Sequence, residues 1–148
     1  MINIIDPHKN VSREVKEADI QRVEKTALEM VEFCKNPQGN FREILALAHQ
    51  QVEKEDPLRF FVTEFNEIII NPVITRHTEV AIDSKEGCVS FPNEPMITVP
   101  RWNKCEVKYQ KIEDSKLVPC EEKLNGQRAK MFQHEIDHLD AKYIYELK

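Results

Sequence analysis

The stretch Gln133-His134-Glu135-Ile136-Asp137-His138-Leu139-Asp140 holds the pattern H-E-x-x-H in a segment with helical apolar spacing. Residues four apart lie one turn above each other on a helix, so both imidazoles can reach one metal ion. Glu135 follows the first of these histidines, where its carboxylate can accept a proton from water at the metal. The alternative is a surface helix whose two histidines form salt bridges with neighbouring acidic side chains.

A catalytic metal needs a third protein ligand besides His134 and His138, and an open position for water. Only about ten residues follow His138, and they contain no histidine or cysteine. We therefore expect the third ligand upstream, which disfavours an ordinary zinc endopeptidase. Cys88, in Glu86-Gly87-Cys88-Val89-Ser90, is the leading candidate, because a thiolate is a strong ligand for zinc or ferrous iron.

The alternative interpretation of Cys88 is a small buried apolar side chain, which is the common fate of a single cysteine. That interpretation suits the other three cysteines, which lie in apolar alternations: Cys34, Cys105 and Cys120. The remaining histidines lack a ligand spacing and are expected to be surface or hydrogen-bonded polar residues: His8, His49 and His77.

The apolar spacing predicts an α+β fold with a mainly antiparallel sheet, an N-terminal helix and the C-terminal H-E-x-x-H helix. We expect helices at residues 19–34 and 125–139, with Asp19 and Asn125 as N-caps. Strands are predicted at 58–63, 67–70, 74–80, 96–99, 104–110 and 117–122, with Pro72 ending the second of them. The apolar residues 44–52 are of undecided type. Residues 1–148 are expected to form a single domain.

Composition narrows the classes of function. The net charge of −5 and the pI near 5.6 argue against a DNA-binding protein, which would present a basic face. No apolar run is long enough to cross a bilayer, and the N-terminus lacks the pattern of a secretory signal. Four widely spaced cysteines without a C-x-x-C pair argue against a disulfide scaffold and favour a reducing, cytoplasmic setting.

The motifs Glu86-Gly87-Cys88-Val89-Ser90-Phe91-Pro92 and Gln133–Asp140, in this order, resemble those of peptide deformylases. Further segments are similar to the regions between these motifs in that family: Leu58–Val62, Ile69–Pro72 and Val99–Arg101. The resemblance covers nearly the whole chain. It is greatest to short members that lack a C-terminal helix, some of them phage-encoded.

The resemblance implies an enzyme that removes the formyl group from the N-terminal formylmethionine of nascent polypeptides and releases formate. It implies a monomer with Fe²⁺ in the cell, and with Zn²⁺, Ni²⁺ or Co²⁺ in purified protein; contact with the ribosome is left open. Cys88, His134 and His138 would hold the metal, and Glu135 would move the proton. The side-chain amide of Gln51 and the backbone N–H of Val89 would stabilise the oxyanion.

Gln51 is placed by aligning residues 46–52 with a family motif, Gly-x-Gly-x-Ala-Ala-x-Gln. Ile44 and Ala46 replace its two glycines, and His49 stands where a small residue is usual. If the backbone at these positions needs a positive φ, side chains other than glycine strain it and destabilise the fold. If glycine only leaves space beside the backbone, the replacements narrow the substrate cleft instead. The departure is the sole support for an alternative, a catalytically impaired homologue that serves as a metal- or peptide-binding module.

The resemblance also places the substrate pocket at Leu45, Ala46, Gly87, Gln127, Lys130 and Met131. The pocket for a methionine side chain is normally apolar, which suits Met131 but not Gln127 or Lys130. Either the stems of these two side chains line the wall while their polar ends reach solvent, which we prefer, or the pocket is more polar than usual. Glu86 and Arg101 form an ion pair or are unrelated surface charges, and Ala141 occupies a position where glycine is common.

Overall fold

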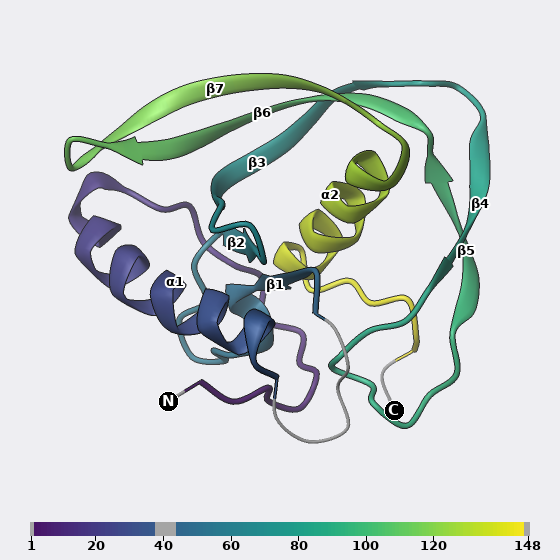
Figure 1. The fold of residues 1–148 in the computed structure, drawn as a ribbon, viewed down its shortest axis with the longest axis horizontal. Helices are drawn as coiled ribbons and strands as arrows, with labels where there is room; N and C mark the ends of the chain where they lie inside the picture. The colour runs from purple at the N-terminus through teal and green to yellow at the C-terminus, as the bar shows by residue number, and fades with distance from the viewer. Residues whose placement is uncertain (1, 38–43, 147–148) are drawn as a thin grey trace.

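The computed structural model describes residues 2–37 and 44–146, and their elements form an α+β arrangement (Figure 1). Five strands make one antiparallel sheet in the order β1-β2-β3-β6-β7, and β4 pairs with β5 in a separate antiparallel ribbon. The predicted fold class is therefore confirmed. In chain order the elements are η1 (Glu17–Asp19), α1 (Ile20–Lys35), β1 (Ala46–Ala48), η2 (His49–Gln51), β2 (Phe60–Thr63), β3 (Ile68–His77), β4 (Ala81–Glu86), β5 (Ile97–Trp102), β6 (Lys104–Glu113), β7 (Lys116–Asn125) and α2 (Gly126–Leu139).

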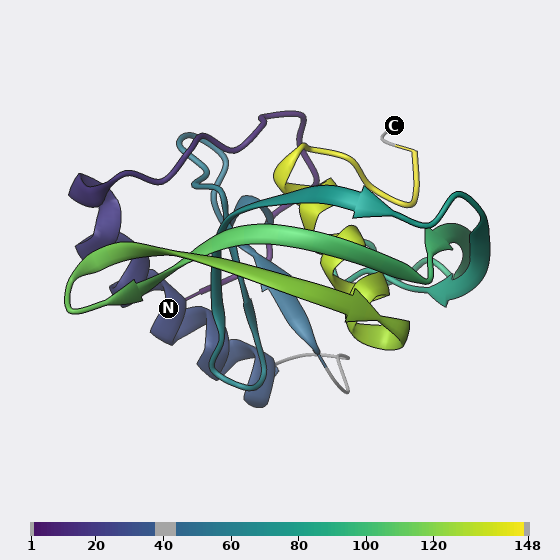
Figure 2. The same ribbon diagram turned by 90° about the horizontal axis from the view of Figure 1, so that it is seen from above.

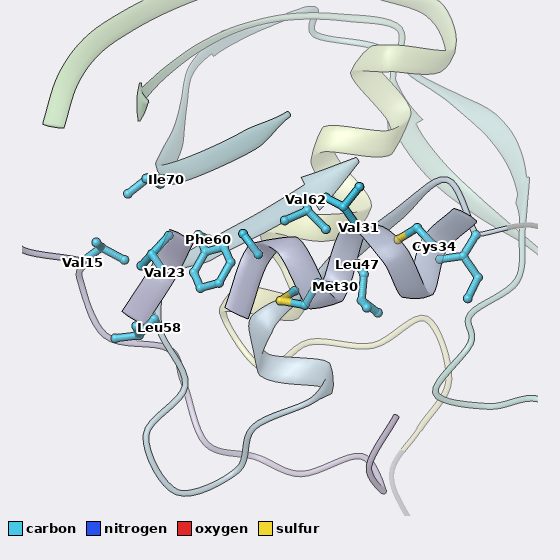
Figure 3. Packing of buried hydrophobic residues seen from close by; sticks show 12 residues of the cluster. Val15, Val23, Met30, Val31, Cys34, Leu47, Leu58, Phe60, Val62 and Ile70 are labelled. Atoms are coloured by element: carbon cyan, nitrogen blue, oxygen red, sulfur yellow. The ribbon is translucent and has the colours of Figure 1, made fainter. Parts of the chain in front are cut away.

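Helix α1 covers one face of the short strands at the start of the sheet (Figure 3). Its buried side chains recur every three or four residues, which puts them on one stripe of the helix. They pack against alternate side chains of the strands, in a cluster that includes Val23, Met30, Leu47, Phe60 and Val62. Each such buried side chain stabilises the fold by roughly 1.5–3 kcal/mol.

Helix α2 packs on the opposite face of the same strands. Side chains alternate across a strand, so Phe61 points away from the α1 cluster and meets Phe132 of α2 edge to face, with ring centroids 5.1 Å apart. All four residues of β2 are buried as a result. A strand enclosed on both faces explains the uninterrupted apolar run in its sequence. This packing fixes the position of α2, the helix that carries the H-E-x-x-H pattern.

The expectation that Pro72 ends a strand was wrong. Strand β3 continues through Pro72 to His77, so residues 74–77 of the predicted third strand are its continuation and residues 78–80 lie outside it. The pairing with β6 shifts between Ile70 and Val73, which leaves Pro72 in a bulge where no ladder hydrogen bond is lost. Asn71 makes the bend at φ 51°, and its side chain bonds to both backbone groups of Val15.

Strand β4 was not predicted, because it lacks the alternation of a half-buried strand. Most of its residues are exposed, and its continuous antiparallel pairing with β5 supplies the backbone hydrogen bonds. The long β6–β7 hairpin crosses the molecule above the helices (Figure 2). Neither helix in the described part of the chain combines the length and apolar character that a membrane crossing requires.

Candidate metal centre

Three metal-ligating side chains converge between α2 and the turn that follows β4. His134 and His138 lie one turn apart on α2, and their Nε2 atoms are 2.9 Å apart. The Sγ atom of Cys88 lies 3.4 Å from Nε2 of His138, although the two residues are 50 positions apart in sequence. All three ligand atoms lie within 4.8 Å of one another. Tetrahedral coordination with metal–nitrogen bonds of about 2.0–2.1 Å separates two nitrogen ligands by roughly 3.3 Å, so these donors fit one divalent ion after a small outward shift.

Glu86 determines which nitrogen of His134 faces the other ligands. Its carboxylate accepts a hydrogen bond from Nδ1 of His134 (2.8 Å), which leaves Nε2 directed at the site. Arg101 donates two bonds to the same carboxylate (2.9 and 2.8 Å) and one to Asp137 (2.7 Å). Burial opposes the charge on Glu86, but the hydrogen bonds from His134 and Arg101 outweigh it and lower the pKa of Glu86 to about 2. Glu86 and Arg101 are therefore an ion pair, not unrelated surface charges.

The two histidines lie in different electrostatic environments. Burial lowers the pKa of His138 well below its usual value, and the neighbouring His134 lowers it further. Burial also opposes a charge on His134, yet its hydrogen bonds to Cys88 and Glu86 raise the pKa of His134 to about 10. The site thus favours a positive charge between a thiol, a carboxylate and two rings. A divalent cation satisfies the same demand, and the donor set suits one.

Glu135 directly follows His134 and lines a cavity that Cys88 and His134 also line. Its Oε1 atom is buried and has no hydrogen-bond partner among the described residues. Burial raises the pKa of Glu135 to about 7, against the opposing effect of the charge on His134. Buried polar atoms without partners are rare in proteins, and a carboxyl group that titrates near neutral pH is suited to proton transfer.

Gln51, in η2, reaches the turn that carries Cys88. The backbone N–H of Ala48 donates to its Oε1 (3.0 Å), which orients the amide nitrogen toward the site. That nitrogen donates to Oγ of Ser90 (2.9 Å) and lies 3.7 Å from Sγ of Cys88. The amide of the neighbouring Gln50 instead donates to the hydroxyl of Tyr143. The role of Gln51 in catalysis stays a prediction.

A cavity of about 630 Å³ is lined by two of the three ligands, Cys88 and His134. The cavity is lined by every residue predicted for the substrate pocket: Leu45, Ala46, Gly87, Gln127, Lys130 and Met131. The catalytic candidates Gln51, Val89 and Glu135 line it as well. Ile44, Ser84, Met96 and the partly exposed Lys130 give the wall a mixed character. The part that each residue plays in binding stays a prediction.

The two replaced glycines and the added histidine have local explanations. Neither Ile44 nor Ala46, the first residue of β1, has a positive φ. The replacements therefore change the space beside the backbone and do not strain it. His49 is buried, stacks on Phe60 with ring centroids 4.9 Å apart, and accepts a hydrogen bond from the backbone N–H of Leu58 (2.8 Å). His49 is therefore a satisfied core residue, as is His8, which bonds to the backbone oxygen of Gln50.

Some contacts could not be found from sequence spacing. Gln133 bonds through its amide to both backbone groups of Trp102 and so ties α2 to β5. Ser90 lies inside a quoted motif, but only the structure shows it as the acceptor for Gln51. Tyr143, beyond the motif helix, packs against His138. All four cysteines are free. Cys34 and Cys105 are buried as expected, whereas Cys120 is only partly buried.

The polypeptide deformylase family model matches residues 6–147. The chain belongs to this family. A peptide deformylase of Thermus thermophilus is 36% identical over 116 residues, which are 78% of this chain and 51% of that protein. Peptide deformylase 2 of Bacillus anthracis is 31% identical over 155 residues, which cover 93% of this chain and 82% of that protein. The chain thus spans about half the length of the Thermus relative it matches.

Solved deformylase structures share the fold. The peptide deformylase of Thermotoga maritima superposes with a TM-score of 0.82 at 30% identity, over 97% of this chain and 95% of that chain. The enzyme from the Vibrio parahaemolyticus bacteriophage VP16T gives a TM-score of 0.79 at 29% identity, over 97% and 100% of the two chains. The predicted similarity to phage members is thereby confirmed.

Proposed function

We propose that this chain is a metal-dependent amide hydrolase that removes the formyl group from N-formylmethionyl peptides and releases formate. The observation that carries the proposal is the convergence of Cys88, His134 and His138. Two of them, Cys88 and His134, line a cavity together with Glu135. Family membership supports the same reaction. An endopeptidase would need a third ligand other than Cys88, and the described residues offer no other group of three such ligands.

A divalent metal held by Cys88, His134 and His138 supplies Lewis acidity, which activates water and polarises a carbonyl. Glu135 takes a proton from the attacking water and later delivers it to the departing amine. The amide of Gln51, already oriented by Ala48, donates to the oxygen of the formyl group as negative charge develops there. The backbone N–H of Val89 is the second proposed donor.

We propose that the substrate binds in the cavity beside the metal site. Leu45, Ala46 and Gly87 are proposed to contact the peptide main chain, since they line the cavity beside the ligands. Gln127, Lys130 and Met131, on α2, are proposed to enclose the methionine side chain. We favour an arrangement in which the stem of Lys130 lines the wall and its amine reaches solvent, because the residue is partly exposed.

The finer points of the proposal follow the family. We propose Fe²⁺ as the metal in the cell, with Zn²⁺, Ni²⁺ or Co²⁺ supporting the site in purified protein. Residues 1–148 would act as a single catalytic domain and as a monomer. The substrates would be nascent polypeptides in the cytoplasm, near the ribosome.

The test is anaerobic purification, followed by metal analysis and a formate-release assay with a formyl-Met tripeptide on one sample. We expect about one divalent metal per chain and formate release. Glu135→Gln should keep the metal and abolish release, whereas Glu24→Gln on the exposed face of α1 should change neither. Metal binding without formate release by the unchanged protein would instead support an impaired homologue that serves as a binding module.

Two further variants examine single roles. Gln51→Ala should lower kcat by on the order of 100–1,000-fold, the usual loss of one oxyanion donor. Gln21→Ala, at an exposed position of α1, is its control. Cys88→Ala should lose the metal, and unchanged metal content in that variant would contradict the proposed ligand set.

A further inference from the structure

An aromatic side chain beyond α2 contacts both elements that carry the metal ligands. The ring of Tyr143 lies 5.2 Å from the ring of His138 and 5.6 Å from that of Phe91, between centroids. Phe91 closes the turn that begins at Cys88, since its backbone N–H donates to the carbonyl of Cys88 (3.0 Å). Tyr143 therefore packs against a ligand on the helix and against the turn that supplies the thiol.

Buried groups far away in sequence hold the hydroxyl of Tyr143. The backbone N–H and carbonyl of His8 both lie 3.2 Å from it. The side-chain amide of Gln50 lies 2.8 Å away through Nε2 and 3.0 Å through Oε1, and Gln50 is fully buried. Gln50 directly precedes Gln51, whose amide reaches the same turn through Ser90. The hydroxyl thus fixes the ring from one side while the ring supports the ligands on the other.

The neighbouring residues extend this contact along the turn. Phe91 also lies against the ring of Tyr145, with centroids 5.0 Å apart, and the hydroxyl of Tyr145 donates to the carbonyl of Pro95. The segment after α2 therefore covers the turn from Phe91 to Pro95.

We propose that Tyr143 is a positioning residue that holds Cys88 and His138 at the separation metal binding requires. The two ligands come from segments 50 residues apart, and their ligand atoms lie 3.4 Å from each other. A contact that bears on both segments limits their relative movement, and so raises affinity for the metal. The inference rests on the proposed metal site, but not on the deformylation reaction.

The experiment measures metal binding in three variants of the metal-loaded protein. Each is challenged with a competing chelator, and the Co²⁺ form is examined for its thiolate-to-cobalt absorption band. Tyr143→Leu removes the ring and its anchor, and should weaken affinity by about 10–100-fold and alter the band. Tyr143→Phe keeps the ring and loses only hydrogen bonds, so it should lose about 3–10-fold. Tyr109→Leu, whose hydroxyl donates to Glu122 on the sheet, is the matched control and should bind as the unchanged protein does.

The graded loss, with an unaffected control, supports the positioning role. Unchanged affinity and an unchanged cobalt band in both Tyr143 variants would overturn it, and so would an equal loss in the Tyr109 control. If far-UV circular dichroism shows that Tyr143→Leu is unfolded, Tyr143→Phe decides alone by the same criteria. If the unchanged protein binds no metal, the proposed function fails together with the positioning role. If the unchanged protein binds metal and the Tyr143 variants bind it equally well, only the positioning role fails.

Discussion

Replacing His49 by asparagine should remove a large part of the acid sensitivity of this fold. His49 is 2% exposed, and burial, followed by the charge of Arg22, lowers the pKa of His49 from 6.5 to about 4. Its ring is held neutral by packing on Phe60 and by the hydrogen bond that Nδ1 accepts from Leu58. Asparagine carries an acceptor near the position of Nδ1 but does not titrate.

The direction follows from proton binding in the two states. Between pH 6.5 and about 4 the unfolded chain takes up a proton at His49 that the folded chain does not, so stability falls as the pH falls. Above pH 6.5 the ring is neutral in both states and contributes no pH dependence. At about 1.4 kcal/mol for each pKa unit, the loss approaches roughly 3 kcal/mol near pH 4, with about 2 kcal/mol of it reached by pH 5.

Urea denaturation followed by far-UV circular dichroism, at several pH values from 7.5 to 5, measures the effect. At pH 7.5 His49→Asn should be the less stable protein, because the stacking on Phe60 is lost. The difference in the free energy of unfolding should then shrink by about 2 kcal/mol on going to pH 5. Effects of metal release and of carboxylate titration are common to both proteins and cancel in this difference.

His77→Asn is the matched control, since His77 is exposed on β3 and stacks on Trp102. This variant should reproduce the pH dependence of the unchanged protein. A stability difference between the unchanged protein and His49→Asn that stays constant from pH 7.5 to 5 would refute the reasoning, because it would mean that the fold accepts a charged ring at this position.

Arg101→Met should destabilise the fold by about 3–5 kcal/mol in urea denaturation, because it removes the guanidinium group that makes two hydrogen bonds to the buried carboxylate of Glu86; a loss below about 1 kcal/mol would contradict this. Ala141 has φ 58°, so Ala141→Gly should relieve about 1–2 kcal/mol of left-handed strain. Greater freedom of the unfolded chain offsets about 0.4–1 kcal/mol of that gain, and a lower melting temperature would argue against the strain. Lys130→Ile should lower KM for formyl-Met peptides roughly tenfold, equivalent to about 1.4 kcal/mol of binding, and an unchanged KM would place the side chain outside the pocket.

The spacing of apolar residues and histidines within single elements was sufficient to predict much of the fold. The apolar stripe of α1 and the histidine spacing of α2 are properties of a helix, so their periodicity reveals them without tertiary information. The motif around Cys88 likewise identified its thiol as a candidate for the third metal ligand. Strand β4 and the passage of β3 through Pro72 escaped prediction, because pairing partners and a bulge, not side-chain alternation, determine them.

The sequence by itself determined which groups are available: two imidazoles on one helix face, an adjacent carboxylate and a thiol in a glycine-containing turn. Only the tertiary structure decided that the thiol meets the rings, that the amide of Gln51 bonds to Ser90 in the turn of the thiol, and that Tyr143 packs against His138. The reason is physical. Spacing within a helix or strand is fixed by backbone geometry, whereas contacts across 50 or 135 residues depend on how two buried clusters orient the elements that carry them.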